Sequence, residues 1–263
     1  MKRFLLTLDG AFVLGLGLYM LVLSQTEAYA AFMNPRFRPL TAAGGVGLCL
    51  AAVAFLIRPG GAIDARRTLC FAILGMLALH AGSGSLKSAS GFAVKPPLAA
   101  RVEPDPHVVR DGVRYLKSNP ARLFLSLQAG QAAPPDQRYI TRGVVKRSAQ
   151  LDRLGKFALL RGNMVCCLAD AIAMGMMVAP GGSPGLQGGE WVEILGRIQP
   201  LETPIAITDL GATDQAPFAV VYNQAVFLAE SIETIEPPRF AYVFELPTSG
   251  KRPLQLSGGD EDY

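Results

Sequence analysis

The fold of this chain is decided by the stretch at 156–198, which reads KFALLRGNMVCCLADAIAMGMMVAPGGSPGLQGGEWVEILGRI. Its first part is largely apolar and leads to two adjacent cysteines, and a second apolar run follows at 171–179. A segment of Gly, Pro and Ser then leads to 191–198, where apolar residues recur at every second position. The stretch therefore predicts three strands, at 156–167, 171–179 and 191–198.

Two further strands complete the predicted domain. Residues 139–146 show a period of two and carry Gly143 in the middle, which indicates a bulge or the close approach of another backbone. Residues 225–235 form the last predicted strand, before Pro237 and Pro238. Five short strands with meandering connections are typical of a small OB-like β-barrel, and a β-sandwich fits the same pattern.

Two short helices are predicted before the barrel. The first begins at Asp105-Pro106, because proline favours the first helical position, and carries apolar residues at 109, 113 and 116. The second begins at Asn119-Pro120 and continues through 123–127. We expect both helices to cover one face of the strands.

The N-terminal part has the composition of a membrane protein. Hydrophobic residues make up 50% of the 263 residues and charged residues only 17%. Apolar segments at 4–23, 40–57 and 68–83 are each close to the roughly 20 residues that cross a bilayer, the third being the shortest. The predicted fold class is an α+β membrane protein, with two to three N-terminal transmembrane helices followed by short helices and the OB-like barrel.

This reading divides the chain into four parts. They are a transmembrane helical region at 1–86, a linker at 87–106 that contains several prolines, the OB-like domain at 107–245, and a tail at 246–263. The tail is rich in Pro, Ser and Gly and ends in acidic residues, so we expect it to be disordered.

The orientation follows from the basic residues. Those at 2–3 and 58–67 favour the cytoplasmic side, which makes this a multi-pass protein of the cell membrane with an extracytoplasmic C-terminal domain. The basic residues at 36–38 then lie outside, against the rule. The small residues at 28–31 also fit a signal-peptide cleavage site, and cleavage there leaves the rest of the chain outside as well.

The candidate functional residues gather around Cys166 and Cys167. In one interpretation the two thiols are structural; in a second, they bind a soft divalent metal such as zinc together with Asp170 and His107. In a third, an exposed thiol exchanges with the disulfide of a partner. Arg161 is a possible ion-pair partner of Asp170, with an architectural or a functional role.

Other classes of function have little support in the sequence. The chain has 2 histidines, and no Ser/His/Asp set and no lysine-bearing phosphate loop is recognisable, so no enzyme is predicted. The net charge of +4 and the single tryptophan do not favour nucleic acid as a partner, although OB barrels often bind it.

Several of these segments together resemble the YcgQ-like permease-subunit family. The resemblance lies in YAAFMNPRF at 29–37, in Arg161 with CCLADA at 166–171, in Trp191-Val192 followed by Gly196, and in 232–238. One departure is Gly162-Asn163, where apolar residues are expected, and it affects the register of that strand.

The resemblance implies a bacterial membrane protein that acts beside a separate multi-spanning permease. It implies a transport context without a mechanism or a transported substrate. The first functional hypothesis is therefore an accessory subunit of a membrane permease, with the OB-like domain next to the transporter. The alternative is an extracytoplasmic metal-binding or thiol-active module built around Cys166, Cys167 and Asp170.

Overall fold

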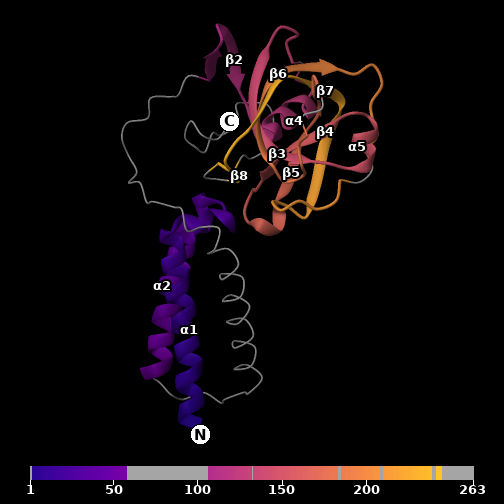
Figure 1. Ribbon diagram of the computed structural model, residues 1–263. Coiled ribbons are helices and arrows are strands. Elements are labelled where there is room, and N and C mark those ends of the chain that lie inside the picture. Colours follow the sequence, from indigo (N-terminus) through magenta and orange to yellow (C-terminus); the bar gives the residue numbers. More distant parts are fainter. Residues whose placement is uncertain are drawn as a thin grey trace. The chain divides into compact units, whose positions relative to one another are not determined.

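The computed structural model of the protein describes residues 2–57, 106–131, 133–182, 185–207, 210–238 and 241–244. These residues belong to two compact units, 1–97 and 98–263, and each unit is described by itself (Figure 1). The third predicted transmembrane segment, nearly all of the predicted linker and the predicted tail lie outside the described residues.

The first unit is a pair of closely packed helices, α1 (Lys2–Gln25) and α2 (Arg38–Ile57). A Cβ atom on Gly17 would lie 2.8 Å from the carbonyl oxygen of Gly45 and 2.7 Å from the sulfur of Cys49. A Cβ atom on Gly45 would lie 2.9 Å from the carbonyl oxygen of Gly17. The two backbones therefore approach so closely that only glycine fits at these two positions, a packing typical of small residues between membrane helices.

The connection between these helices includes the segment at 29–37. The connection contains two short 3₁₀ helices, η1 (Glu27–Ala31) and η2 (Pro35–Phe37). Tyr29 is fully buried, and its hydroxyl lies 2.7 Å from the hydroxyl of Thr41. The Arg38 guanidinium donates to the Thr26 carbonyl at 3.1 Å. These contacts fix the turn between α1 and α2.

Large apolar side chains face outward from both helices, among them Leu18, Val22, Leu40, Leu50 and Ile57. Within the described residues, Pro35–Ala54 is long and apolar enough to cross a membrane, and Gly10–Gln25 is apolar but shorter. A signal sequence near an N-terminus has the same properties, so this finding supports one membrane-spanning helix only weakly. The multi-pass topology stays a prediction.

The second unit contains a closed barrel of five strands: β3 (Arg138–Lys146), β4 (Phe157–Asn163), β5 (Ile172–Ala179), β6 (Trp191–Pro200) and β7 (Phe218–Thr234). They hydrogen-bond in the order β3-β6-β7-β5-β4, and β4 pairs with β3 to close the ring. Among the five pairings of this ring, the one between β5 and β7 is parallel and the others are antiparallel. This closure confirms the OB-like barrel and excludes the sandwich.

The first predicted helix is wrong. Residues 105–116 were expected to be helical, but they form a hairpin of β1 (His107–Arg110) and β2 (Val113–Lys117). Asp111 and Gly112 connect the strands with φ angles of 51° and 77°, which an Asp-Gly pair adopts readily in a two-residue hairpin turn. The second predicted helix is confirmed as α4 (Pro120–Gln128), and the Asn119 side chain caps it by accepting from the backbone N–H of Arg122.

The inner core of the barrel is apolar and is completed by α4. Leu123 of α4 packs with side chains from all five strands, including Val145, Leu159, Met176, Ile194 and Phe227. A Cβ atom on Gly143 would lie 2.7 Å from the Leu160 carbonyl oxygen and 3.0 Å from the Pro120 ring. The close backbone approach that the sequence predicts at Gly143 is therefore confirmed.

The segment at 201–216, of which 201–207 and 210–216 are described, lies between β6 and β7 and covers the outer face of β4 and β5. Leu201, Ile205, Ile207 and Leu210 pack with outward-facing residues of these strands, such as Leu160 and Ala173, in a second core. The short strand β8 (Tyr242–Val243) pairs parallel to β4, and the helix α5 (Ala149–Arg153) lies between β3 and β4. Strand β7 begins at Phe218 rather than at residue 225.

Candidate functional site

The two adjacent cysteines lie in a turn and not on a strand. The sequence predicts a strand over 156–167, but β4 ends at Asn163 and a single 3₁₀ turn, η3 (Leu168–Asp170), precedes β5. Neighbouring side chains on a strand point to opposite faces of its sheet, but Cys166 and Cys167 are free of that constraint because they lie outside β4. Both side chains can serve one site.

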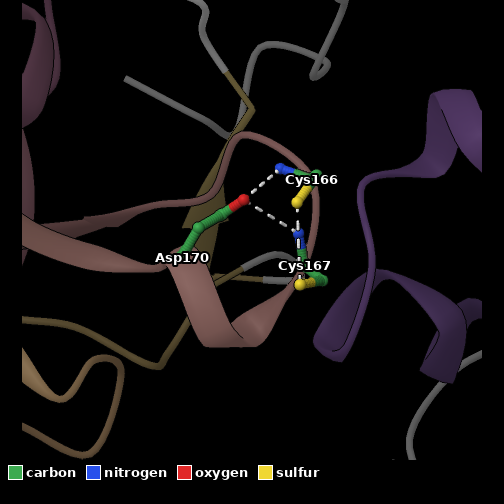
Figure 2. A group of neighbouring side chains, drawn as sticks. All are labelled: Cys166, Cys167 and Asp170. Atoms are coloured by element: carbon green, nitrogen blue, oxygen red, sulfur yellow. Dashed lines mark hydrogen bonds between the residues drawn. The ribbon is translucent and has the colours of Figure 1, made fainter.

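Asp170 is the residue that shapes this turn. Its Oδ1 accepts a hydrogen bond from the backbone N–H of Val165 at 3.0 Å, and its Oδ2 accepts from those of Cys166 at 2.8 Å and Cys167 at 3.3 Å. Figure 2 shows the carboxylate turned toward the two cysteine N–H groups. Three successive N–H groups that converge on one carboxylate draw the chain out of the extended strand, which explains why β4 ends early.

These hydrogen bonds also set the charge of Asp170. Partial burial by itself raises the pKa of the carboxyl group, but hydrogen bonds from the Cys166 thiol and the three backbone N–H groups outweigh it. The net result is a pKa below the ordinary value, so Asp170 is a carboxylate at neutral pH.

The two thiols lie side by side next to this carboxylate. The sulfur atoms are 3.6 Å apart, and one ligand atom from each of Cys166, Cys167 and Asp170 lies within 4.8 Å of the others. Both cysteines are free thiols; Cys166 is exposed and Cys167 is partly buried. A hydrogen bond to Asp170 and, to a smaller extent, one to Cys167 raise the pKa of the Cys166 thiol to about 11. The thiol is therefore protonated at neutral pH and is a weak nucleophile.

The other predicted ligand lies on a different element. His107 is on β1, where its Nδ1 is 3.0 Å from the guanidinium of Arg114. Among the described residues, the group of close metal-ligand atoms contains Cys166, Cys167 and Asp170, and His107 is not in it.

The motif residues Arg161, Trp191 and Gly196 occupy structural positions in the barrel. Arg161 is fully buried on β4, and its guanidinium carbon lies 4.8 Å from the centroid of the Trp191 ring, a cation–π contact. At Gly196, a Cβ atom would lie 2.0 Å from the carbonyl oxygen of Leu228, beside an irregularity in the pairing of β6 with β7. The backbone hydrogen bonds to Asp170 come from residues 165–167 of its own turn, and the ion pair between Arg161 and Asp170 stays a prediction.

Sequence reasoning missed the residues that hold the end of β4. Gln215 is buried, and its side-chain oxygen accepts from the backbone N–H of Gly162 at 2.7 Å. A Cβ atom on Gly162 would lie 2.8 Å from the Tyr242 ring. Glycine is thus required where the family pattern suggests an apolar residue, and the register through Asn163 is regular. No local signal points to Gln215, because it is far from Gly162 in the sequence.

A separate hollow of about 510 Å³ lies between residues 207 and 210–212 on one side and the beginning of β7 on the other, and Phe218 and Val220 are among its lining residues. None of the three metal-ligand residues lines it. Its walls are mostly apolar, so it adds no chemical group to the site at the cysteines.

Comparison with known proteins finds one similar family, and its match lies over the barrel. No curated protein matches the chain. Residues 135–245 match a family described as the DUF1980 C-terminal domain, and this span includes all five barrel strands and the cysteine turn. An uncharacterised family fits the resemblance drawn from the motifs, and the YcgQ-like name itself stays a prediction. Residues 135–245 are therefore similar to the DUF1980 C-terminal domain, which defines a family of uncharacterised bacterial proteins.

Proposed function

We propose that the OB-like domain binds a soft divalent cation, zinc being the first choice, at the turn that carries Cys166, Cys167 and Asp170. The observation behind the proposal is that two thiol sulfurs and a carboxylate oxygen lie within 4.8 Å of one another. Thiolate and carboxylate are both established ligands of zinc, and soft thiolates select against Mg²⁺ and Ca²⁺.

The arrangement supports this interpretation over a purely structural one. A structural pair would bury at least one thiol as a small apolar residue, whereas Cys166 is exposed and Cys167 is only partly buried. The turn is closed mainly by three backbone N–H groups that donate to Asp170, and the two sulfurs 3.6 Å apart add little to its support.

Thiol exchange is supported less well than metal binding. The raised pKa of Cys166 keeps the thiolate fraction low at neutral pH, and a bond between adjacent cysteines closes a strained ring. A cation must also displace the thiol protons, but its charge favours the thiolates and offsets that cost, and no strained ring is formed.

The test is metal analysis of the full chain in mild detergent. After equilibration with Zn²⁺ and removal of free ions, the wild-type protein should retain about one ion per chain, and the Cys166→Ser/Cys167→Ser variant should retain none. Cys49→Ser is the matched control, since Cys49 lies on α2 and outside the cluster. Equal zinc content in the wild type and the double variant would reject the proposal.

A second candidate function concerns the first unit. The close packing of α1 on α2 at Gly17 and Gly45, with large apolar side chains outside, suits a membrane-embedded helix pair that presents an apolar surface to another membrane protein. Together with the family resemblance, this supports an accessory subunit that holds the OB-like domain outside the cytoplasm beside a permease.

Purification in mild detergent tests this second candidate. We expect a multi-spanning protein to co-purify with the wild-type chain, and Gly45→Leu, which disturbs the helix pair, to reduce its yield. Recovery of the wild-type chain alone, under conditions that preserve a known membrane complex, would contradict the accessory role.

A further inference from the structure

We infer that the cation site is open: this turn supplies two sulfurs and one oxygen to a tetrahedral ion, and the remaining position takes a ligand from outside, through which the ion is handed to an acceptor. This inference rests on the proposed function, because it specifies how the same site holds and releases its cation. The acceptor is defined by its chemistry, as a thiolate or imidazole group on a partner.

The spacing of the sulfurs favours tetrahedral geometry. With Zn–S bonds of about 2.3 Å, two sulfurs of a tetrahedral site lie about 3.8 Å apart, and the same bonds in a linear arrangement place them about 4.6 Å apart. The sulfurs of Cys166 and Cys167 are 3.6 Å apart, which corresponds to an S–Zn–S angle of about 103°. The distance between the two sulfurs is therefore close to that of a tetrahedral zinc site before any ion binds.

Asp170 is suited to supply one further donor. A carboxylate has about four lone-pair positions. Three of them are used by the backbone N–H groups of residues 165–167, with a single bond on Oδ1 and two on Oδ2. The Cys166 thiol donates to the carboxylate as well, and that position becomes free when a cation displaces the thiol proton. A bidentate contact would break the backbone hydrogen bonds that hold the turn. One oxygen and two sulfurs make three protein ligands.

The surroundings leave the fourth position accessible. Within the part of the chain that the structure describes, no other His, Cys, Asp or Glu joins the cluster. Cys166 is exposed, and the next turn, including Leu168 at 39% exposure, is also open to solvent. Structural zinc sites are closed by four protein ligands, whereas sites with three protein ligands admit water or another molecule. An incoming ligand can thus bind before the ion leaves.

The experiment measures how zinc leaves the full-length protein. The chain, in detergent and loaded with Zn²⁺, is mixed with increasing concentrations of a chromophoric chelator, and the rate of transfer is recorded. For an open site, the rate should about double when the chelator concentration doubles, because the chelator enters the free position. Cys49→Ser should behave as the wild type, since Cys49 is outside the cluster.

The outcomes separate the inference from the function on which it rests. Zinc retention equal to that of Cys166→Ser/Cys167→Ser would reject both. Specific retention with a transfer rate independent of the chelator concentration would show a closed site, leaving the binding function intact and overturning the inference. X-ray absorption gives a second readout: two sulfur and two oxygen or nitrogen scatterers support an open site, and three or more sulfurs refute it.

Discussion

Replacement of Asp170 tests whether this side chain holds the turn together. In Asp170→Ala, the backbone N–H groups of Val165, Cys166 and Cys167 lose a charged acceptor. A buried hydrogen bond to a charged group contributes about 1.5–3 kcal/mol, but water replaces much of this where the N–H groups are accessible. Cys166 is exposed, so we expect a total loss of about 2 kcal/mol in the free energy of unfolding, well below the sum of three buried bonds.

The single tryptophan makes this loss measurable in the full chain. Trp191 lies on β6 and contacts Arg161 inside the barrel unit, so its fluorescence follows unfolding of that unit. The Asp170→Ala protein in detergent should unfold at a lower denaturant concentration than the wild type. Asp170→Asn keeps one acceptor oxygen and should lose about half as much stability. Identical midpoints for the wild type and Asp170→Ala at pH 7 would refute this account of the turn.

The same difference should depend on pH with a defined sign. The pKa of Asp170 is lowered in the folded protein, so its stabilising effect is fully present above the ordinary carboxyl pKa of about 3.9. The effect is lost as the pH falls through the lower folded-state pKa, because a protonated carboxyl group binds the N–H groups less well. The gap between the wild type and Asp170→Asn should therefore close in acid.

Two more predictions concern the barrel and the thiols. Gly143→Ala should destabilise the barrel by about 1–3 kcal/mol in the same fluorescence assay, because the new methyl group meets the Leu160 carbonyl. Gly188→Ala is the control, since a methyl group has room there and should change the stability little. Equal stability of the two variants would contradict this. The rate of alkylation of Cys166, followed by peptide mass spectrometry, should be low at pH 8 and rise about tenfold per pH unit up to about pH 10. Asp170→Asn should raise the rate at pH 8, because it lowers the pKa of the thiol. A rate unaffected by that substitution would show that Asp170 does not control the thiol.

The barrel is predictable from sequence because its strands keep clear apolar runs separated by Gly and Pro. The hairpin at 107–117 is harder to predict, since Val109 and Val113 also fit helical spacing. The sequence signal for its turn is the Asp111-Gly112 pair. The pattern of β4 is equally ambiguous: it is buried at every position, because the inner core lies on one side and the segment at 201–216 on the other. Such a strand shows no alternation that could mark its end.

The residues of the site can be predicted from the sequence, but their arrangement in space cannot. Cys166, Cys167 and Asp170 stand out by type and spacing, yet the apolar residues before them continue the strand pattern without a break. The strand ends because the Asp170 carboxylate collects three backbone N–H groups, a local hydrogen-bond preference that apolar periodicity does not register. His107 was grouped with the cysteines on the assumption of a helix, and the hairpin removes that reason.

The segment at 201–216 changes what kind of surface the barrel can offer. OB barrels commonly receive ligands across their second and third strands, which are β4 and β5 here, and that wall is lined with the chain's own Ile205, Ile207 and Leu210. A ligand lying across the strands would have to displace a packed apolar layer and uncover the Gln215 contact with Gly162. Under the proposed function, the binding site therefore lies at a turn of the barrel and not on the wall that this segment covers.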